Sequence, residues 1–101
     1  VPHARAATCH LSHSYIEGAC VYFTFAANPP AEEFEETYTA LWAAGQQAAI
    51  AAGASLSHHH GVGHSRAPFV RQALGDGLDV LRAVKNALDP NNILNPGKLG
   101  L

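Results

Sequence analysis

An α+β fold, with an antiparallel sheet backed by helices, is the fold class that the sequence predicts. Two apolar segments near the start are separated by a short polar connection, which is typical of a β-hairpin. Later segments repeat apolar residues at helical spacing. With 48% hydrophobic and 14% charged residues, the 101-residue chain has the composition of one compact domain with a modest core.

The hairpin is expected from residues 7–13 and 18–26, joined through residues 14–17 with turn chemistry at Gly18. In the second strand, side chains alternate between two faces. We assign one face to the core, with Val21, Phe23 and Phe25. The other face is more polar and carries Cys20, Tyr22 and Thr24. A buried phenol at Tyr22 needs a hydrogen-bond partner or a chemical role, and a strand tyrosine with its hydroxyl in water is the simpler alternative.

The two cysteines, Cys9 and Cys20, are too few for a disulfide framework. In this hairpin, we expect Cys9 to lie opposite a residue near Thr24, so the two sulfurs are not neighbours. Free thiols in a reducing cytoplasm fit this arrangement.

A long helix is predicted after the hairpin, with Asn28 as N-cap and Pro29-Pro30 in its first turn. Its acidic residues suit the positive end of the helix dipole, so we assign them to a solvated helix start rather than to a site: Glu32, Glu33, Glu35 and Glu36. The predicted apolar stripe comprises Phe34, Tyr38, Leu41, Trp42, Gly45, Ala48, Ala49 and Ile50. Gly53 ends the helix.

Residues 54–57 are predicted to form a third strand that leads into the histidine loop. A helix from Pro68 to Leu74 is broken by residues 75–77, and a second helix follows until Asp89-Pro90 stops it. The second helix has the apolar stripe Leu78, Leu81, Val84 and Leu88, with Arg82 and Lys85 pointing outward. The tail, residues 91–99, is too rich in Asn, Pro and Gly for regular structure and should lie across a neighbouring surface.

Three consecutive histidines, His58, His59 and His60, precede Gly61 and Gly63. Imidazoles move protons near neutral pH, and the glycines allow positive φ and close approach of a ligand. An affinity tag does not explain an internal run of three. Two other interpretations stay open: a polar loop whose histidines satisfy nearby backbone groups, and a metal site formed by His58, His60 and His64. Since neither a cysteine nor a carboxylate lies at ligand spacing, we expect no metal.

Charge and hydropathy exclude several classes of protein. Six basic and eight acidic side chains give a net charge of −2, with no basic stripe, so nucleic acid and anionic membrane are poor partners. No apolar stretch approaches the ~20 residues of a membrane span. The chain starts at Val1 and has no methionine, so we expect it to be a fragment of a longer protein.

Three segments carry a resemblance to a known family: residues 14–25, residues 57–63 and residues 88–99. Together they resemble the carboxyl-terminal end of FAD-linked oxidases of the vanillyl-alcohol-oxidase superfamily. Within it, the chain is most similar to the alkyldihydroxyacetonephosphate synthase (alkylglycerone-phosphate synthase) family and its bacterial relatives. The triple histidine is the more specific motif, because other members typically carry one histidine there.

The resemblance implies that FAD is held mainly by an absent amino-terminal domain. Residues 1–88 would be the carboxyl-terminal part of the substrate (cap) domain, with a ferredoxin-like fold, and residues 89–101 a tail packed against the FAD-binding domain. The family reaction exchanges the acyl chain of acyl-dihydroxyacetone phosphate for a fatty alcohol in ether-lipid synthesis. On the motif match, Tyr22 is the proton donor or acceptor, residues 58–60 are the essential histidines, and Asn95 contacts the cofactor.

Two alternatives remain, since His64-Ser65-Arg66 departs from the basic pair that many family members have after Gly63. One is an FAD-dependent dehydrogenase or oxidase of a 2-hydroxy acid or similar small substrate. The other is a non-catalytic binding or dimerisation module. The expected partners are a small-molecule or lipid-like substrate, the missing FAD-binding domain and, through an exposed apolar face, a second copy in a homodimer. We expect a bacterial cytoplasmic protein, peripheral to the membrane in its full-length form, and an inactive fragment.

Overall fold

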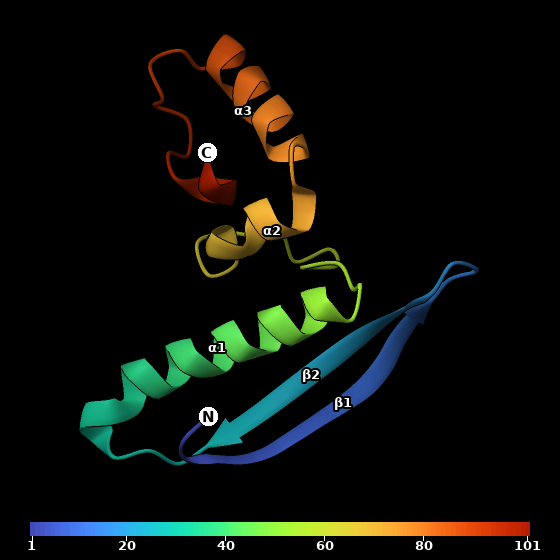
Figure 1. The fold of residues 1–101 in the computed structure, drawn as a ribbon, viewed down its shortest axis with the longest axis vertical. Coiled ribbons are helices and arrows are strands. Elements are labelled where there is room, and N and C mark those ends of the chain that lie inside the picture. Colours follow the sequence, from blue (N-terminus) through green and yellow to red (C-terminus); the bar gives the residue numbers. More distant parts are fainter. The chain divides into compact units, whose positions relative to one another are not determined.

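The computed structural model describes residues 1–101, which divide into two compact units, residues 1–45 and residues 46–101. The predicted α+β class with an antiparallel sheet is confirmed (Figure 1). The elements in chain order are β1 (Ala4–Ser14), β2 (Ala19–Ala27), the 3-10 turn η1 (Ala31–Glu33), α1 (Phe34–Ala51), η2 (Ala67–Phe69), α2 (Val70–Leu74), α3 (Gly77–Leu88) and η3 (Lys98–Gly100).

The hairpin of β1 and β2 forms as predicted, but its register differs by one residue. Cys9 lies opposite Phe23, not Thr24. The connection is closed by a hydrogen bond from the Tyr15 N–H to the Gly18 carbonyl at 2.7 Å. Because side chains alternate along a strand, this register places Cys9 and Cys20 on opposite faces, and both are free thiols as expected.

The apolar face of β2 is only partly covered, which corrects its assignment to the core. The Phe23 side chain is 59% exposed and Phe25 is 44% exposed. At one end α1 does cover this face: a Cβ built on Gly45 would lie 3.3 Å from the Phe25 ring. In this unit one helix lies beside the two-stranded sheet (Figure 1). Leu11, Val21 and Phe23 on this face stay exposed.

The start of α1 also differs from the prediction, because Asn28 is not its N-cap. The Asn28 N–H donates to the His3 carbonyl at 3.1 Å, which extends the pairing of the hairpin. A 3-10 turn after Pro30 leads into the helix instead, and no side chain caps it. The acidic start is confirmed, and Glu33 accepts a hydrogen bond from the His3 ring at 2.8 Å.

The carboxyl end of α1 is a Schellman motif centred on Gly53, as its position predicts. The Gly53 N–H donates to the Ile50 carbonyl and the Ala54 N–H to the Ala49 carbonyl, both at 2.9 Å. Gly53 has a φ of +77°, a conformation that costs other residues a clash between Cβ and the following carbonyl.

Replacing Gly53 by alanine is therefore expected to lower the free energy of unfolding by about 1 kcal/mol. Nothing lies within 4 Å of a Cβ at this position, so the penalty comes from the backbone alone. Urea denaturation of Gly53→Ala and Gly53→Asn tests this, since asparagine tolerates the left-handed conformation and should lose less. An unchanged midpoint for the alanine variant would contradict the prediction.

The predicted third strand at residues 54–57 does not form. The chain leaves the Schellman motif and passes through bends into the histidine loop. The sheet has two strands only, and a strand needs a neighbour for its backbone hydrogen bonds. A local bond replaces that pairing, from the Ser55 hydroxyl to the Ser57 carbonyl at 3.3 Å.

In residues 46–101, α2 and α3 form with the predicted break between them. Two apolar side chains of the chain are buried, Val70 at 1% and Leu78 at 4% exposure. The other residues of the predicted apolar stripe of α3 are exposed: Leu81, Val84 and Leu88. No helix of the chain has the length and apolar character needed to span a membrane.

Candidate functional site

Tyr22 occupies the middle of β2, where its side chain is half-buried. The register places His10 of β1 directly opposite it. The two rings stack with centroids 5.1 Å apart and planes 7° from parallel. Alternation puts this pair on the face opposite Phe23 and Phe25, as the sequence predicted for Tyr22.

His10, which stacks on Tyr22, is not among the site residues predicted from the sequence. With Cys9 placed opposite Thr24, His10 would face Phe23 and lie on the other side of the sheet from Tyr22. The signal that could have revealed it is an imidazole and a phenol at matching positions of a short hairpin, since cross-strand ring pairs are preferred neighbours.

The histidine run lies in an exposed loop of the second unit, before η2. His59 has a φ of +48°. The His60 N–H donates to the His58 carbonyl at 2.6 Å, which closes a three-residue turn around His59. Backbone conformations of this kind cost free energy and concentrate at functional sites.

This turn brings the three imidazoles together. Nδ1 of His58 and Nδ1 of His59 are 2.7 Å apart, within hydrogen-bond distance, and their rings meet edge to face. The rings of His59 and His60 have centroids 4.4 Å apart. The three histidines that are consecutive in the sequence therefore also have neighbouring rings.

The Nδ1 to Nδ1 contact fixes how protons are distributed on the pair. One ring must donate from Nδ1 and the other must accept there, because one proton lies between the two nitrogens. In the neutral pair, the donor ring is then unprotonated at Nε2 and the acceptor ring carries its proton on Nε2. Two adjacent side chains thus present a base and an acid, which suits proton transfer in both directions.

Gly61 and Gly63 follow the histidines with φ of +73° and +57°. Open space surrounds the Cβ position of each. The Arg66 guanidinium donates to the Gly61 carbonyl at 3.4 Å and so links the two ends of this segment. The predicted positive φ is therefore found at both glycines, and without side chains they leave the backbone accessible. Nowhere do three or more His, Cys, Asp or Glu side chains meet at a spacing that could hold a metal ion.

A small pocket of about 180 Å³ lies within the second unit beside the histidine loop. The Ser57 hydroxyl is buried without a hydrogen-bond partner. The lining is mostly apolar and comes from the loop, α2 and the tail: Ser55, Leu56, Ser57, Val62, Val70, Ala73, Leu74 and Leu99.

The tail is held by the buried Asp89 carboxylate, which follows α3. Its oxygens accept hydrogen bonds from the Ile93 N–H at 3.0 Å and the Leu94 N–H at 2.9 Å. Lys85 forms an ion pair with the same carboxylate and donates to the Leu94 carbonyl at 2.8 Å. Lys85 is thus half-buried rather than outward-pointing, because the tail folds back over it. The Lys85 ammonium and the two amides lower the pKa of Asp89.

Asp89→Asn is expected to loosen this tail, since it removes the charge and one acceptor oxygen. We expect the Ile93 and Leu94 amides to exchange with deuterium about tenfold faster, the effect of one lost hydrogen bond. Because the folded-state pKa is lowered, the stabilisation is present above the ordinary aspartate pKa of about 4 and is lost as pH falls through the folded value. Acidification should therefore lower the protection of these two amides in the wild type. Asp76→Asn, which removes a carboxylate that does not bond to these amides, is the control and should leave their protection unchanged. An Asp89→Asn tail with wild-type protection would contradict this role.

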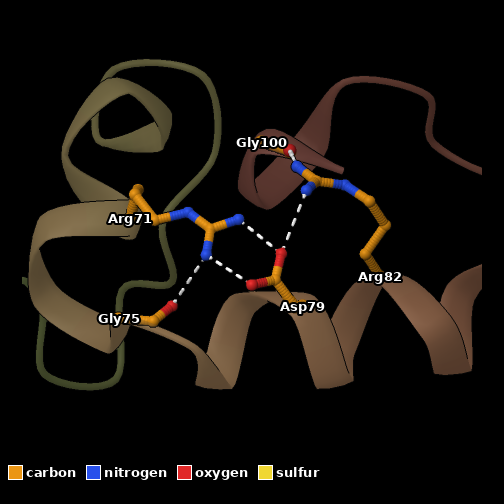
Figure 2. Close-up of polar contacts among 5 residues, drawn as sticks. All are labelled: Arg71, Gly75, Asp79, Arg82 and Gly100. Carbon is orange, nitrogen blue, oxygen red and sulfur yellow. Dashed lines mark hydrogen bonds and ion pairs between the residues drawn. The ribbon is translucent and has the colours of Figure 1, made fainter.

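Asp79 of α3 bonds to Arg71 of α2, and its neighbour Arg82 bonds to Gly100 of η3 (Figure 2). The Asp79 carboxylate accepts two hydrogen bonds from Arg71, at 2.7 and 2.5 Å, and Arg82 lies 3.5 Å away. Arg82 also donates to the Gly100 carbonyl at 3.0 Å. The paired guanidinium lowers the pKa of Asp79. Arg82, predicted to point outward, is exposed and bridges α3 to the tail.

The tail therefore lies in part across its own unit. Asn95 is exposed with a φ of +48°, and its carbonyl accepts from the Lys98 N–H at 3.3 Å. A Cβ on Gly97 would lie 3.7 Å from the His64 ring, so tail and histidine loop are neighbours. Tyr22 belongs to the first unit and the histidines to the second.

The groups of the histidine loop are chemically suited to FAD. The loop presents ring N–H donors and, at two glycines, an open backbone that a flat ring can approach. The chain contains no glycine-rich turn between a strand and a helix for a pyrophosphate. Of the predicted site residues, the histidine run therefore carries groups suited to a flavin ring.

Residues 3–99 match the family model of FAD linked oxidases, C-terminal domain. The chain is 37% identical over 92 residues to an alkyldihydroxyacetonephosphate synthase of Trypanosoma brucei brucei, covering 90% of this chain and 15% of that protein. It is 33% identical over 105 residues to an uncharacterized FAD-linked oxidoreductase of Escherichia coli, covering 97% of this chain and 22% of the relative.

A third relative is a glycolate oxidase subunit of Bacillus subtilis, 38% identical over 69 residues, which cover 67% of this chain and 14% of the relative. No solved structure gives a significant match. The chain thus spans 14–22% of the length of these relatives. The family match covers nearly all of it, so the chain belongs to the FAD-linked oxidase family and corresponds to its carboxyl-terminal domain.

Proposed function

We propose that this chain is part of an FAD-dependent transferase that exchanges the acyl chain of acyl-dihydroxyacetone phosphate for a fatty alcohol. The observation that carries the proposal is the run of three imidazoles with its Nδ1 to Nδ1 contact at 2.7 Å. The similarity of the chain, over 90% of its length, to a protein named alkyldihydroxyacetonephosphate synthase supports the same reaction.

The reaction needs groups that move protons without net oxidation. A proton leaves the carbon beside the substrate carbonyl, and the acyl group departs as a carboxylate with its ester oxygen. The alcohol then loses its proton and its oxygen bonds to that carbon, which regains a proton from the enzyme. A base that becomes an acid within the same cycle meets this requirement.

In this proposal the His58 and His59 pair supplies such a base and acid side by side. Tyr22 takes and returns the proton at the carbon. His60 extends the row of imidazoles toward the substrate, and Asn95 contacts the cofactor. When bound, FAD supplies the electrophilic centre that activates the substrate carbon.

The remainder of the enzyme is proposed to cover the apolar surface that this chain leaves open. Phe23 is 59% exposed and Leu11, its neighbour on the same face, is 72% exposed. Apolar patches of this kind mark interaction surfaces. The chain spans 15% of the synthase relative, which leaves ample sequence to provide the covering surface.

The test is anaerobic absorbance of the flavin in a full-length protein that contains this chain. Acyl-dihydroxyacetone phosphate is added first and a fatty alcohol second, and the products are analysed. Bleaching by the first compound, recovery with the second and an ether product would support the transferase. The absence of both response and ether product would overturn it.

A second candidate is oxidation of a 2-hydroxy acid on the same scaffold. It is favoured by similarity to a glycolate oxidase subunit over 67% of the chain and to an FAD-linked oxidoreductase over 97%. Bleaching by glycolate or lactate, with recovery only on adding an electron acceptor, distinguishes it from the redox-neutral transferase. The histidines would then accept the hydroxyl proton of the substrate.

A further inference from the structure

His10 shares a face of the hairpin with Tyr22. The pairs on either side along this face are Thr8 with Thr24 and Ser12 with Cys20. These are small side chains, so the two rings are the bulkiest groups on this part of the sheet and meet each other directly, 5.1 Å apart and 7° from parallel.

This stack restrains the phenol where the strand alone does not. A tyrosine side chain on the open face of a sheet can change rotamer, which moves its hydroxyl by several ångströms. A parallel ring at this separation lies within the 4.5–7 Å range of favourable aromatic contacts. Because β1 and β2 pair on both sides of this position, the His10 backbone is fixed relative to the Tyr22 backbone, and the stack holds the two rings against each other.

We propose that His10 is a positioning residue for Tyr22, and that its ring plane, rather than its basicity, holds the Tyr22 hydroxyl in place for proton transfer. The proposal rests on the proposed function through the role of Tyr22 as proton donor and acceptor. His10 acts through Tyr22 and does not touch the reacting atoms. A displaced acid or base lowers turnover more than it lowers substrate binding.

The first experiment compares His10→Leu and His10→Phe in the full-length protein, with whichever substrate it turns over. Leucine keeps bulk and strand packing without a ring, whereas phenylalanine keeps a flat ring without nitrogen. We expect kcat to fall about tenfold in His10→Leu with KM within about twofold, and His10→Phe to stay within about twofold of the wild type. His13→Asn is the matched control, because it removes a histidine from the same strand at a φ of +51°, which asparagine tolerates.

The second experiment repeats His10→Leu in the Tyr22→Phe background. If His10 acts through the Tyr22 hydroxyl, no further loss of kcat appears there. Equal loss in both backgrounds, a His10→Phe variant as slow as His10→Leu, or a wild-type rate for His10→Leu overturns the proposal. If Tyr22→Phe itself keeps the wild-type rate, the proposed role of Tyr22 fails and that of His10 fails with it, a result distinct from failure of His10 alone.

Discussion

Replacing Tyr22 by phenylalanine is expected to lower the turnover of the full-length enzyme about 100-fold or more, within the usual range for a group that transfers a proton. Phenylalanine keeps the ring that stacks on His10 at 5.1 Å and removes the hydroxyl alone. Fold and substrate binding should therefore persist, and the loss should appear in kcat rather than KM. Steady-state kinetics with product analysis measure both constants.

Tyr38→Phe is the matched control. Tyr38 lies on α1, where it is exposed and packs edge-on against Trp42. The same hydroxyl deletion there should leave kcat within about twofold of the wild type. A Tyr22→Phe enzyme with unchanged turnover would remove Tyr22 from the mechanism and leave a structural role for its stack with His10.

Local signals in the sequence predict much of this fold, because the interactions concerned are local. The hairpin follows from alternation and its turn, and the end of α1 follows from Gly53, whose motif involves neighbouring residues only. Asn28 shows the limit of such reasoning. It has the residue type of an N-cap, yet a hydrogen bond to His3 across the hairpin decides its place.

Errors in the prediction arise where distant segments compete. A periodic pattern shows which face of a strand is apolar but not what covers that face. The pattern therefore predicts a core position for Phe23, whereas the structure leaves this residue 59% exposed. Lys85 was assigned to solvent, but the tail brings Leu94 over it. The strand predicted at residues 54–57 lacks a partner strand in this chain, which no property of those residues reveals.

In the candidate site too, local features can be predicted from the sequence and contacts between side chains cannot. The histidine run and Tyr22 are recognisable from residue type and motif, whereas their arrangement is not. The pairing of His10 with Tyr22 depends on a register that the sequence analysis placed one residue away. The contact between His58 and His59 depends on the left-handed backbone of His59. A run of identical residues does not predict that conformation.

His59→Gly is expected to reduce turnover of the full-length enzyme by about 100-fold, because it removes one ring of the proton-sharing pair. Glycine accepts the φ of +48° found at His59, so the turn between His58 and His60 should persist. His59→Asn also tolerates this backbone and places an amide near the position of Nδ1, where it can still bond to His58. Its expected loss is smaller, about tenfold.

His64→Asn is the control within the same loop, since His64 lies outside the run and contacts the tail at Gly97. Its turnover should stay within about threefold of the wild type. Equal losses at positions 59 and 64 would indicate that the loop needs histidines only for its conformation.

Added imidazole separates a chemical role from a structural one. His59 is exposed, so imidazole from solution can reach the space that His59→Gly leaves beside His58. If the missing ring transfers a proton, turnover of His59→Gly should rise with imidazole concentration, and most steeply where the neutral form predominates, above its pKa near 7. Imidazole should leave Tyr22→Phe unchanged, because that variant retains the histidine pair. A folded His59→Gly enzyme whose turnover does not rise at any imidazole concentration would contradict a proton-transfer role for His59 and leave proton transfer to other groups.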